Sequence, residues 1–170
     1  WQPASGATTY KFERRKVGAS SNDETVTTAA LAWAPKAKMA DGAWEWRVSS
    51  LDAGGKVLGA TAWRGFLVDG TAPTITSYTP KTTAKKTASF VVKFSEPVSS
   101  VHSKSFTLKV KGSTTKLLAT VTLNAAGTKA TLDPKVDLKP GKSYTATLNA
   151  GVRDAAGNRL VLFSWNVKAA

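Results

Sequence analysis

The sequence predicts an all-β fold made of two tandem β-sandwiches, the first of them incomplete. Apolar residues alternate with polar ones in many short runs, as in strands with one buried and one solvated face. Turn residues separate these runs, and no run keeps the helical period. With 42% hydrophobic and 21% charged residues, the 170-residue chain has the composition of a folded globular protein.

The chain is expected to divide near residue 70. Residues 1–70 hold 9 of the 24 basic and 7 of the 11 acidic residues, so most of the net charge of +13 falls on residues 71–170, which carry +11. Five of the six tryptophans lie in the first part. Between the parts, Asp69-Gly70-Thr71-Ala72-Pro73 is rich in turn residues, and its proline cannot donate to a sheet ladder. We therefore expect two domains, 1–70 and 71–170.

The second part alternates in about seven short runs. These lie near Ile75 and over residues 90–94, 106–110, 117–123, 130–132, 144–148 and 161–167. Gly112-Ser113, Pro140-Gly141 and Ala156-Gly157-Asn158 are typical turns between them. Seven short antiparallel strands in about 100 residues predict a two-sheet sandwich with Greek-key connections.

The first part carries fewer strands. Tyr10 and Phe12 alternate with charged residues, as do Trp44, Trp46 and Val48, and a last strand is expected from about 58 to 68. Four or five strands in 70 residues are fewer than a complete sandwich needs. We expect this module to be partial, with a missing portion upstream.

Residues 72–168 resemble the bacterial Ig-like domain of S-layer and other cell-surface proteins. The matching stretches are Ala72-Pro73-Thr74-Ile75, Val92-Lys93-Phe94-Ser95-Glu96-Pro97-Val98, Ser105-Phe106-Thr107-Leu108, residues 138–144 and Val152-Arg153-Asp154-Ala155-Ala156-Gly157-Asn158. The order of these motifs, ending in a strand that contains Trp165, carries the resemblance.

Residues 1–68 more loosely resemble a bacterial fibronectin type III-like module. The matching stretches are Trp1-Gln2-Pro3-Ala4-Ser5-Gly6-Ala7-Thr8-Thr9-Tyr10 and Asp41-Gly42-Ala43-Trp44-Glu45-Trp46-Arg47-Val48. Together the resemblances imply tandem modules of a long secreted or cell-surface bacterial protein. Such modules are spacers, adhesive surfaces or accessories to an enzyme elsewhere in the parent chain, and their partners include its other modules.

Several kinds of chemistry are excluded by composition. The chain has no Cys, which removes disulfides, thiol catalysis and Cys-based zinc sites, and its one histidine, His102, cannot form a multi-histidine metal centre. The neighbouring serines lie too close in sequence to supply the geometry of a catalytic triad. No apolar run approaches the roughly 18 to 20 residues that span a bilayer. We expect no catalytic residues, no enzyme and no membrane span.

Tryptophans are the first candidate ligand-binding residues. Trp44 and Trp46 stand two apart and share a strand face, and with Trp63 they could form a flat platform for sugar rings. The favoured alternative is that these rings belong to the core, since Trp buries a large area.

Lysines are the second candidates. Lys93, Lys109 and Lys111, with Lys104 and Lys116, fall at predicted solvent-facing positions or adjacent turns and could bind an anionic polymer or cell-wall polysaccharide. The favoured alternative is that they keep the sheets soluble and protect their edges. No nucleic acid is expected, because stacking aromatics are not interleaved with these cations.

A calcium site is the third candidate. Asp154 and Asn158 bracket a turn, and Asp69 lies at the expected domain junction. Three ligands fall short of the six to eight oxygens that Ca²⁺ takes, so a simple turn is favoured. The sequence thus predicts a non-catalytic structural spacer or adhesion module, secreted or at the cell surface; the alternative is a carbohydrate- or anionic-polymer-binding module. Ca²⁺ is the one candidate cofactor.

Overall fold

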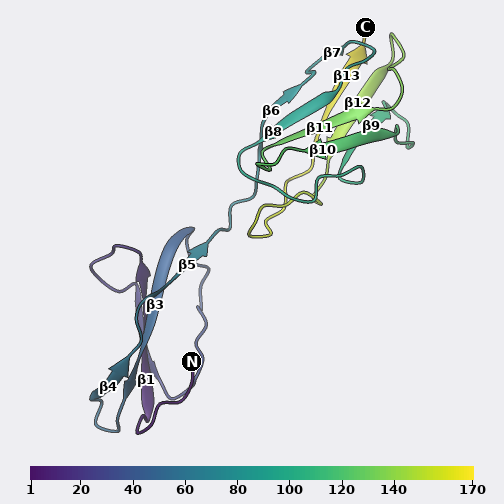
Figure 1. The fold of residues 1–170 in the computed structure, drawn as a ribbon. Helices are drawn as coiled ribbons and strands as arrows, with labels where there is room; N and C mark the ends of the chain where they lie inside the picture. Colours follow the sequence, from purple (N-terminus) through teal and green to yellow (C-terminus); the bar gives the residue numbers. More distant parts are fainter. The chain divides into compact units, whose positions relative to one another are not determined.

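The computed structural model describes residues 1–170 and contains strands, turns and irregular segments (Figure 1). The chain folds as two compact units, Trp1–Gly70 and Thr71–Ala170, which are described separately. No helix in the structure is long and apolar enough to cross a membrane. The prediction of an all-β fold is confirmed.

The first unit is built around one antiparallel sheet. Its strands are β1 (Thr9–Lys16), β2 (Glu24–Thr28), β3 (Gly42–Leu51), β4 (Val57–Ala60) and β5 (Arg64–Val68). They are ordered β2-β1-β3-β4, and β5 also pairs with β3. Because β4 pairs with residues 49–51 of β3 and β5 with residues 42–46, the two short strands share one edge of β3.

The single strand expected from 58 to 68 is thus two strands. The break falls at Thr61, whose N–H donates to the carbonyl oxygen of Val48 at 2.9 Å while its Oγ1 accepts from the Val48 N–H at 3.1 Å. Thr61 therefore satisfies the backbone of β3 between the two ladders, and the chain can turn out of the sheet without leaving an unpaired group.

The register of β1 against β3 gives this sheet an apolar face and a charged face. Phe12 lies opposite Val48 on the apolar face, and Glu13 lies opposite Arg47 on the charged one. Tyr10, Phe12 and Val48 form the small buried core. No second sheet covers the apolar face: the aromatic rings of Trp1 and Trp33, from irregular segments, pack against it.

The second unit consists of two four-stranded sheets. Its strands are β6 (Ile75–Thr79), β7 (Thr83–Ala84), β8 (Phe90–Phe94), β9 (Phe106–Val110), β10 (Ala119–Leu123), β11 (Lys129–Pro134), β12 (Ser143–Leu148) and β13 (Phe163–Ala169). One sheet has the order β10-β11-β8-β6 and the other β7-β13-β12-β9. The predicted two-sheet sandwich is confirmed.

The core of this unit comes from the alternating apolar positions that the sequence shows. On β8, Phe90 and Val92 are fully buried and Lys93 is exposed; on β12, Tyr144, Ala146 and Leu148 are buried. Several other side chains are completely enclosed as well: Phe106, Leu108, Ala130, Leu132 and Val152. These buried side chains belong to one continuous cluster within the second unit.

β7 was not expected from the sequence. It pairs with β13 in parallel, the one parallel pairing among the strands, with the N–H of Lys168 donating to Thr82 at 2.8 Å and that of Ala170 to Ala84 at 2.9 Å. A strand of two residues is too short to show alternation. The pairing links β7, the second strand of the unit, to β13, its last strand.

Candidate functional site

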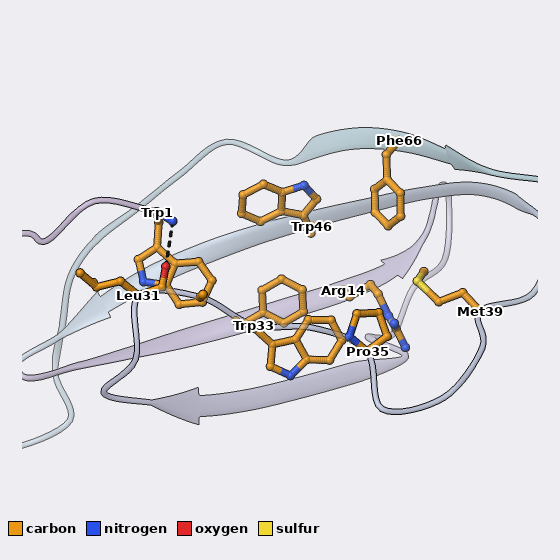
Figure 2. Close-up of a pocket in the computed structure, with 10 residues that line it drawn as sticks. Trp1, Arg14, Leu31, Trp33, Pro35, Met39, Trp46 and Phe66 are labelled. Carbon is orange, nitrogen blue, oxygen red and sulfur yellow. Dashed lines mark hydrogen bonds between the residues drawn. The ribbon is translucent and has the colours of Figure 1, made fainter. Parts of the chain in front are cut away.

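An aromatic groove of about 390 Å³ lies on the apolar face of the first unit (Figure 2). Its lining comes from three strands of the sheet and from segments that lie over them: Trp1, Phe12, Arg14, Leu31, Ala32, Trp33, Pro35, Met39, Trp46 and Phe66. The groove exists because this face carries large rings at alternating positions and has an irregular cover in place of a second sheet.

Stacked rings form the floor of this aromatic groove. Phe12 is the centre of the stack, with its ring centroid 4.3 Å from that of Trp33, 6.1 Å from Trp46 and 6.3 Å from Trp1. The N-terminal ammonium of Trp1 donates to the carbonyl oxygen of Leu31 at 3.1 Å. Trp1, Trp33 and Trp46 stay half-buried, so their outer faces border the groove.

Arg14 closes one end of the aromatic groove. It is 8% exposed, and its guanidinium lies 5.4 Å from the ring centroid of Trp33 and 5.1 Å from that of Trp44. Its Nη2 contacts carboxylate oxygens of Asp23 at 2.6 Å and Glu24 at 3.1 Å. Two carboxylates compensate the charge of this cation at Nη2, whereas its Nε and Nη1 are buried without a hydrogen-bond partner, so Arg14 braces this end of the sheet.

The three tryptophans predicted as a platform do not come together. Trp44 is buried, with 3% exposed, and donates its indole N–H to the carbonyl oxygen of Ala40 at 2.9 Å, so its ring is not open to a ligand. Trp46 lines the aromatic groove. Trp63 packs between Arg15 and Arg47, with their guanidinium carbons 4.1 and 4.7 Å from its ring centroid.

That position places Trp63 on the charged face, away from Trp46, because Arg47 follows Trp46 directly in β3. The aromatic groove is lined by Trp1 and Trp33 instead, two residues that lie outside the alternating segments of the sequence. Phe12 could have been found from its alternation with charged neighbours in β1.

The charged face holds a buried carboxylate with three cationic or amide partners, that of Glu13. Glu13 is 4% exposed and accepts from Arg47 Nε at 2.8 Å and Asn22 Nδ2 at 2.9 Å, with Lys11 Nζ at 3.6 Å. The hydrogen bond from Arg47 lowers the pKa of Glu13, and burial opposes this only in part. Glu13 is therefore a structural anion that ties β1 to β3.

The three candidate lysines lie on different parts of the second unit. Lys93 is on β8, in one sheet, whereas Lys109 is on β9, in the other, and Lys111 follows β9. Lys109 lines a polar groove of about 360 Å³ together with Lys104 and Lys116, which come from the segments before and after β9. The structure thus groups Lys109 with two lysines of its own sheet edge and separates it from Lys93.

The candidate calcium residues have structural contacts. Asp154 is 4% exposed, and its carboxylate accepts from the backbone N–H and the side-chain Nδ2 of Asn158, both at 2.9 Å. Burial tends to raise the pKa of Asp154, but the hydrogen bonds from Asn158 outweigh it, and the pKa is lowered. Asp69 follows β5 at the end of the first unit.

His102 lies in an exposed turn. Its Nδ1 accepts from the Lys104 N–H at 3.2 Å, and its backbone carbonyl accepts from the N–H groups of Ser105 and Phe106, both at 2.9 Å. The buried hydroxyl of Ser105 donates to the carbonyl oxygen of Ser100 at 2.7 Å. These bonds give His102 and Ser105 a role in shaping the turn that leads into β9.

Comparison with known proteins identifies the second unit. A family model described as a bacterial Ig-like domain matches residues 69–166, more than half of the chain. No curated protein matches. Among solved structures, the N-terminal part of the bacterial S-layer protein SbsC is 28% identical, with a TM-score of 0.47, over 58% of this chain and 24% of that one.

A longer structure of SbsC, covering its domains 1–6, has the same identity and TM-score over 58% of this chain and 14% of that chain. The chicken CNTN1 FN1–FN3 domains are 11% identical over 96% of this chain and 57% of that one, with a TM-score of 0.36. The chain spans at most about a quarter of the SbsC structures that it matches. By the family model that covers most of its second unit, the chain belongs to the bacterial Ig-like domain family.

Proposed function

We propose that this chain is a non-catalytic structural spacer of a secreted or surface-attached bacterial protein. The observation that carries the proposal is the parallel pairing of β7 with β13, which links the second strand of the Ig-like unit to its last strand. Membership of the bacterial Ig-like family supports the same role. A spacer has to transmit tension between its two ends without unfolding.

The β7–β13 pair has the geometry that resists such tension. Pulling the N-terminal side of the unit first loads β6, which pairs with β8, and then draws β7 toward its own start, while pulling the C-terminus draws β13 toward its own end. Because the strands are parallel, these two directions oppose each other along the strand axis and the ladder is sheared. Its bonds, from Lys168 to Thr82 and from Ala170 to Ala84, are then loaded together and must break together.

The spacer proposal is tested by pulling single molecules of the full chain from its two ends. We expect a distinct unfolding event for the Ig-like unit, since forced unfolding reports the height of the unfolding barrier. As a control, the same chain is pulled between a Lys142→Cys attachment and the C-terminus.

The residue pair Ser143 and Lys168 places the start of β12 beside the end of β13, so this control geometry peels their bonds one at a time. The unfolding force should be lower in the control than in end-to-end pulling. Equal unfolding forces in the two geometries would show that the β7–β13 pair does not set the resistance to tension. Extension from the ends without an unfolding event would refute the spacer proposal.

The alternative of polymer binding gains more support from the lysines than from the tryptophans. Trp44 is buried and Trp63 lies against Arg15 and Arg47, whereas Lys109 lines a polar groove with two other lysines. A role in adhesion would therefore be expected from the lysine side of the Ig-like unit.

A further inference from the structure

The polar groove at the β9 edge of the Ig-like unit is a concave surface that brings several lysines together. We call it the lysine groove; it is lined by Lys104, Thr107, Lys109, Val110, Gly112, Ser113, Lys116, Thr145, Thr147 and Asn149. Its floor is the outward side of β9 and β12, where Thr107 lies directly opposite Thr147 and Lys109 opposite Thr145. The half-buried Thr145 and Thr147 thus present hydroxyl groups near the ammonium group of Lys109, whereas Thr107 is buried.

The wall of the lysine groove is the chain that returns after β9. Gly112 has a φ of 82°, which allows the tight turn, and the chain then runs back beside β9. The N–H of Leu117 donates to the carbonyl oxygen of Leu108 at 2.8 Å, and Lys116 pairs with Lys109 as an isolated bridge. These backbone contacts hold Lys116 beside Lys109.

Hydrogen bonds also fix the far end of the lysine groove. Asn149 Nδ2 donates to the carbonyl oxygen of Lys104 at 3.0 Å, and its Oδ1 accepts from the Gly151 N–H at 2.9 Å. The backbone that carries Lys104 is therefore tied to the end of β12. Three lysines from three separate segments are brought to one concave surface by the fold.

No acidic side chain compensates these three lysines. None of them forms an ion pair, and the four acidic residues of the unit lie elsewhere: Glu96 after β8, Asp133 on β11, Asp137 after β11 and Asp154 in the turn that Asn158 closes. The sheet β7-β13-β12-β9 contains no acidic residue in any of its strands. A bound anion would thus meet three uncompensated cations and no like charge.

We propose that the lysine groove binds an anionic polysaccharide. The cations attract its carboxylate or other anionic groups, and the half-buried Thr145 and Thr147 offer hydroxyl oxygens to the sugar hydroxyls between them. The groove has no aromatic side chain on which bases could stack, which disfavours single-stranded nucleic acid. Val110 is its one branched apolar side chain, and a single such side chain is not enough apolar surface to insert into a lipid layer. The inference is independent of the spacer proposal.

The test measures binding of the full chain to polygalacturonate, with dextran as the uncharged polymer. The variant is the triple substitution Lys104→Ala, Lys109→Ala and Lys116→Ala. Its matched control is Lys93→Ala, Lys129→Ala and Lys135→Ala, which removes the same charge from β8, β11 and the residue after β11 in the other sheet.

We expect the groove triple to weaken binding by about tenfold or more, since each exposed ion pair contributes modestly and three act together. The control triple should weaken it by less than about twofold. Binding should also fall steeply as salt is raised. Circular dichroism melts of both variants confirm that these exposed substitutions leave the fold intact.

Equal weakening by the two triples would overturn the proposal, because net charge alone would then explain the binding. Equal binding of dextran and polygalacturonate would overturn the role of the anion. Tighter binding of a single-stranded oligonucleotide than of polygalacturonate would reassign the groove to nucleic acid. The variant Thr147→Val, which keeps the side-chain shape, should weaken polygalacturonate binding and leave polyphosphate binding unchanged.

Discussion

Trp165 is the side chain whose replacement should most directly reveal how the Ig-like unit is held together. It is 7% exposed, its ring contacts those of Tyr78, Phe90, Phe106 and Phe163 at centroid distances of 5.1 to 6.2 Å, and its indole N–H donates to the carbonyl oxygen of Pro80 at 2.9 Å. Trp165→Phe keeps a six-membered aromatic ring at this position and removes the pyrrole part of the indole with its N–H.

The expected loss of stability has three parts. The hydrogen bond to Pro80 is worth about 1 kcal/mol. The smaller ring buries about 40 Å² less apolar surface, which costs about 1 kcal/mol. A void of about 35 Å³ adds about 0.8 kcal/mol. The free energy of unfolding of the Ig-like unit should therefore fall by about 3 kcal/mol.

Hydrogen exchange read by mass spectrometry on peptides from β12 and β13 measures this change within the unit. A loss of about 3 kcal/mol speeds exchange through global opening by roughly 100-fold or more. Leu162→Ala is the control, because Leu162 is 65% exposed and its truncation should change stability by less than about 0.5 kcal/mol. An increase below about fivefold in Trp165→Phe would show that this ring is not a main support of the core.

Three further substitutions test other contacts. Glu13→Gln should lower the stability of the first unit by about 1 kcal/mol at neutral pH, measured by urea unfolding, because it weakens the bond to Arg47. The lowered pKa of Glu13 means that its contribution is complete above its unfolded pKa and is lost as the pH falls through the folded one, so the variant and the wild type should converge in acid; a constant difference would contradict this. Asp154→Asn should lower the stability of the Ig-like unit at neutral pH and make it less dependent on pH, since the lowered pKa of Asp154 makes its protonation destabilising in the wild type alone; an unchanged pH dependence of stability would disprove the role of this turn. Gly127→Ala should cost about 2 kcal/mol in thermal unfolding, because Gly127 has a φ of 69° and an added Cβ would lie 3.1 Å from the carbonyl oxygen of Val98; a neutral effect would show that the turn can relax.

The sequence was informative where one face of a strand is buried and the other is solvated. The runs at Phe90–Phe94 and Ser143–Leu148 alternate because their inward residues fill the sandwich core, and both appear as strands in the structure. The short β7 was missed because two residues cannot show a period. The break between β4 and β5 was missed because it depends on Thr61 bonding to β3, a contact between residues 13 apart in the chain.

Alternation also tells which face a residue occupies, but not which sheet its strand joins. Lys93 and Lys109 both read as solvent-facing, and both are on strands, yet β8 and β9 belong to different sheets. The lysine groove depends on that assignment and on the chain running back beside β9 after the turn at Gly112-Ser113. The turn has a local signal in the sequence, but the sheet that each strand joins does not. Trp33 could not be placed in the aromatic groove from the sequence either, because it lies outside any periodic segment.

The cover over the apolar face of the first unit has a consequence for how this unit opens. Within residues 29–41, the hydrogen bonds to the surroundings include those from the Trp1 ammonium to Leu31, from the Ala30 N–H to Thr28, from the Trp44 indole to Ala40 and from the Gly70 N–H to Asp41, and none of these four belongs to a sheet ladder. The segment can therefore lift away while β1, β2 and β3 keep every backbone bond between them. A protease would then cut near Trp33 in a molecule that is still folded, and the uncovered rings of Phe12 and Trp46 would make that nicked molecule prone to self-association.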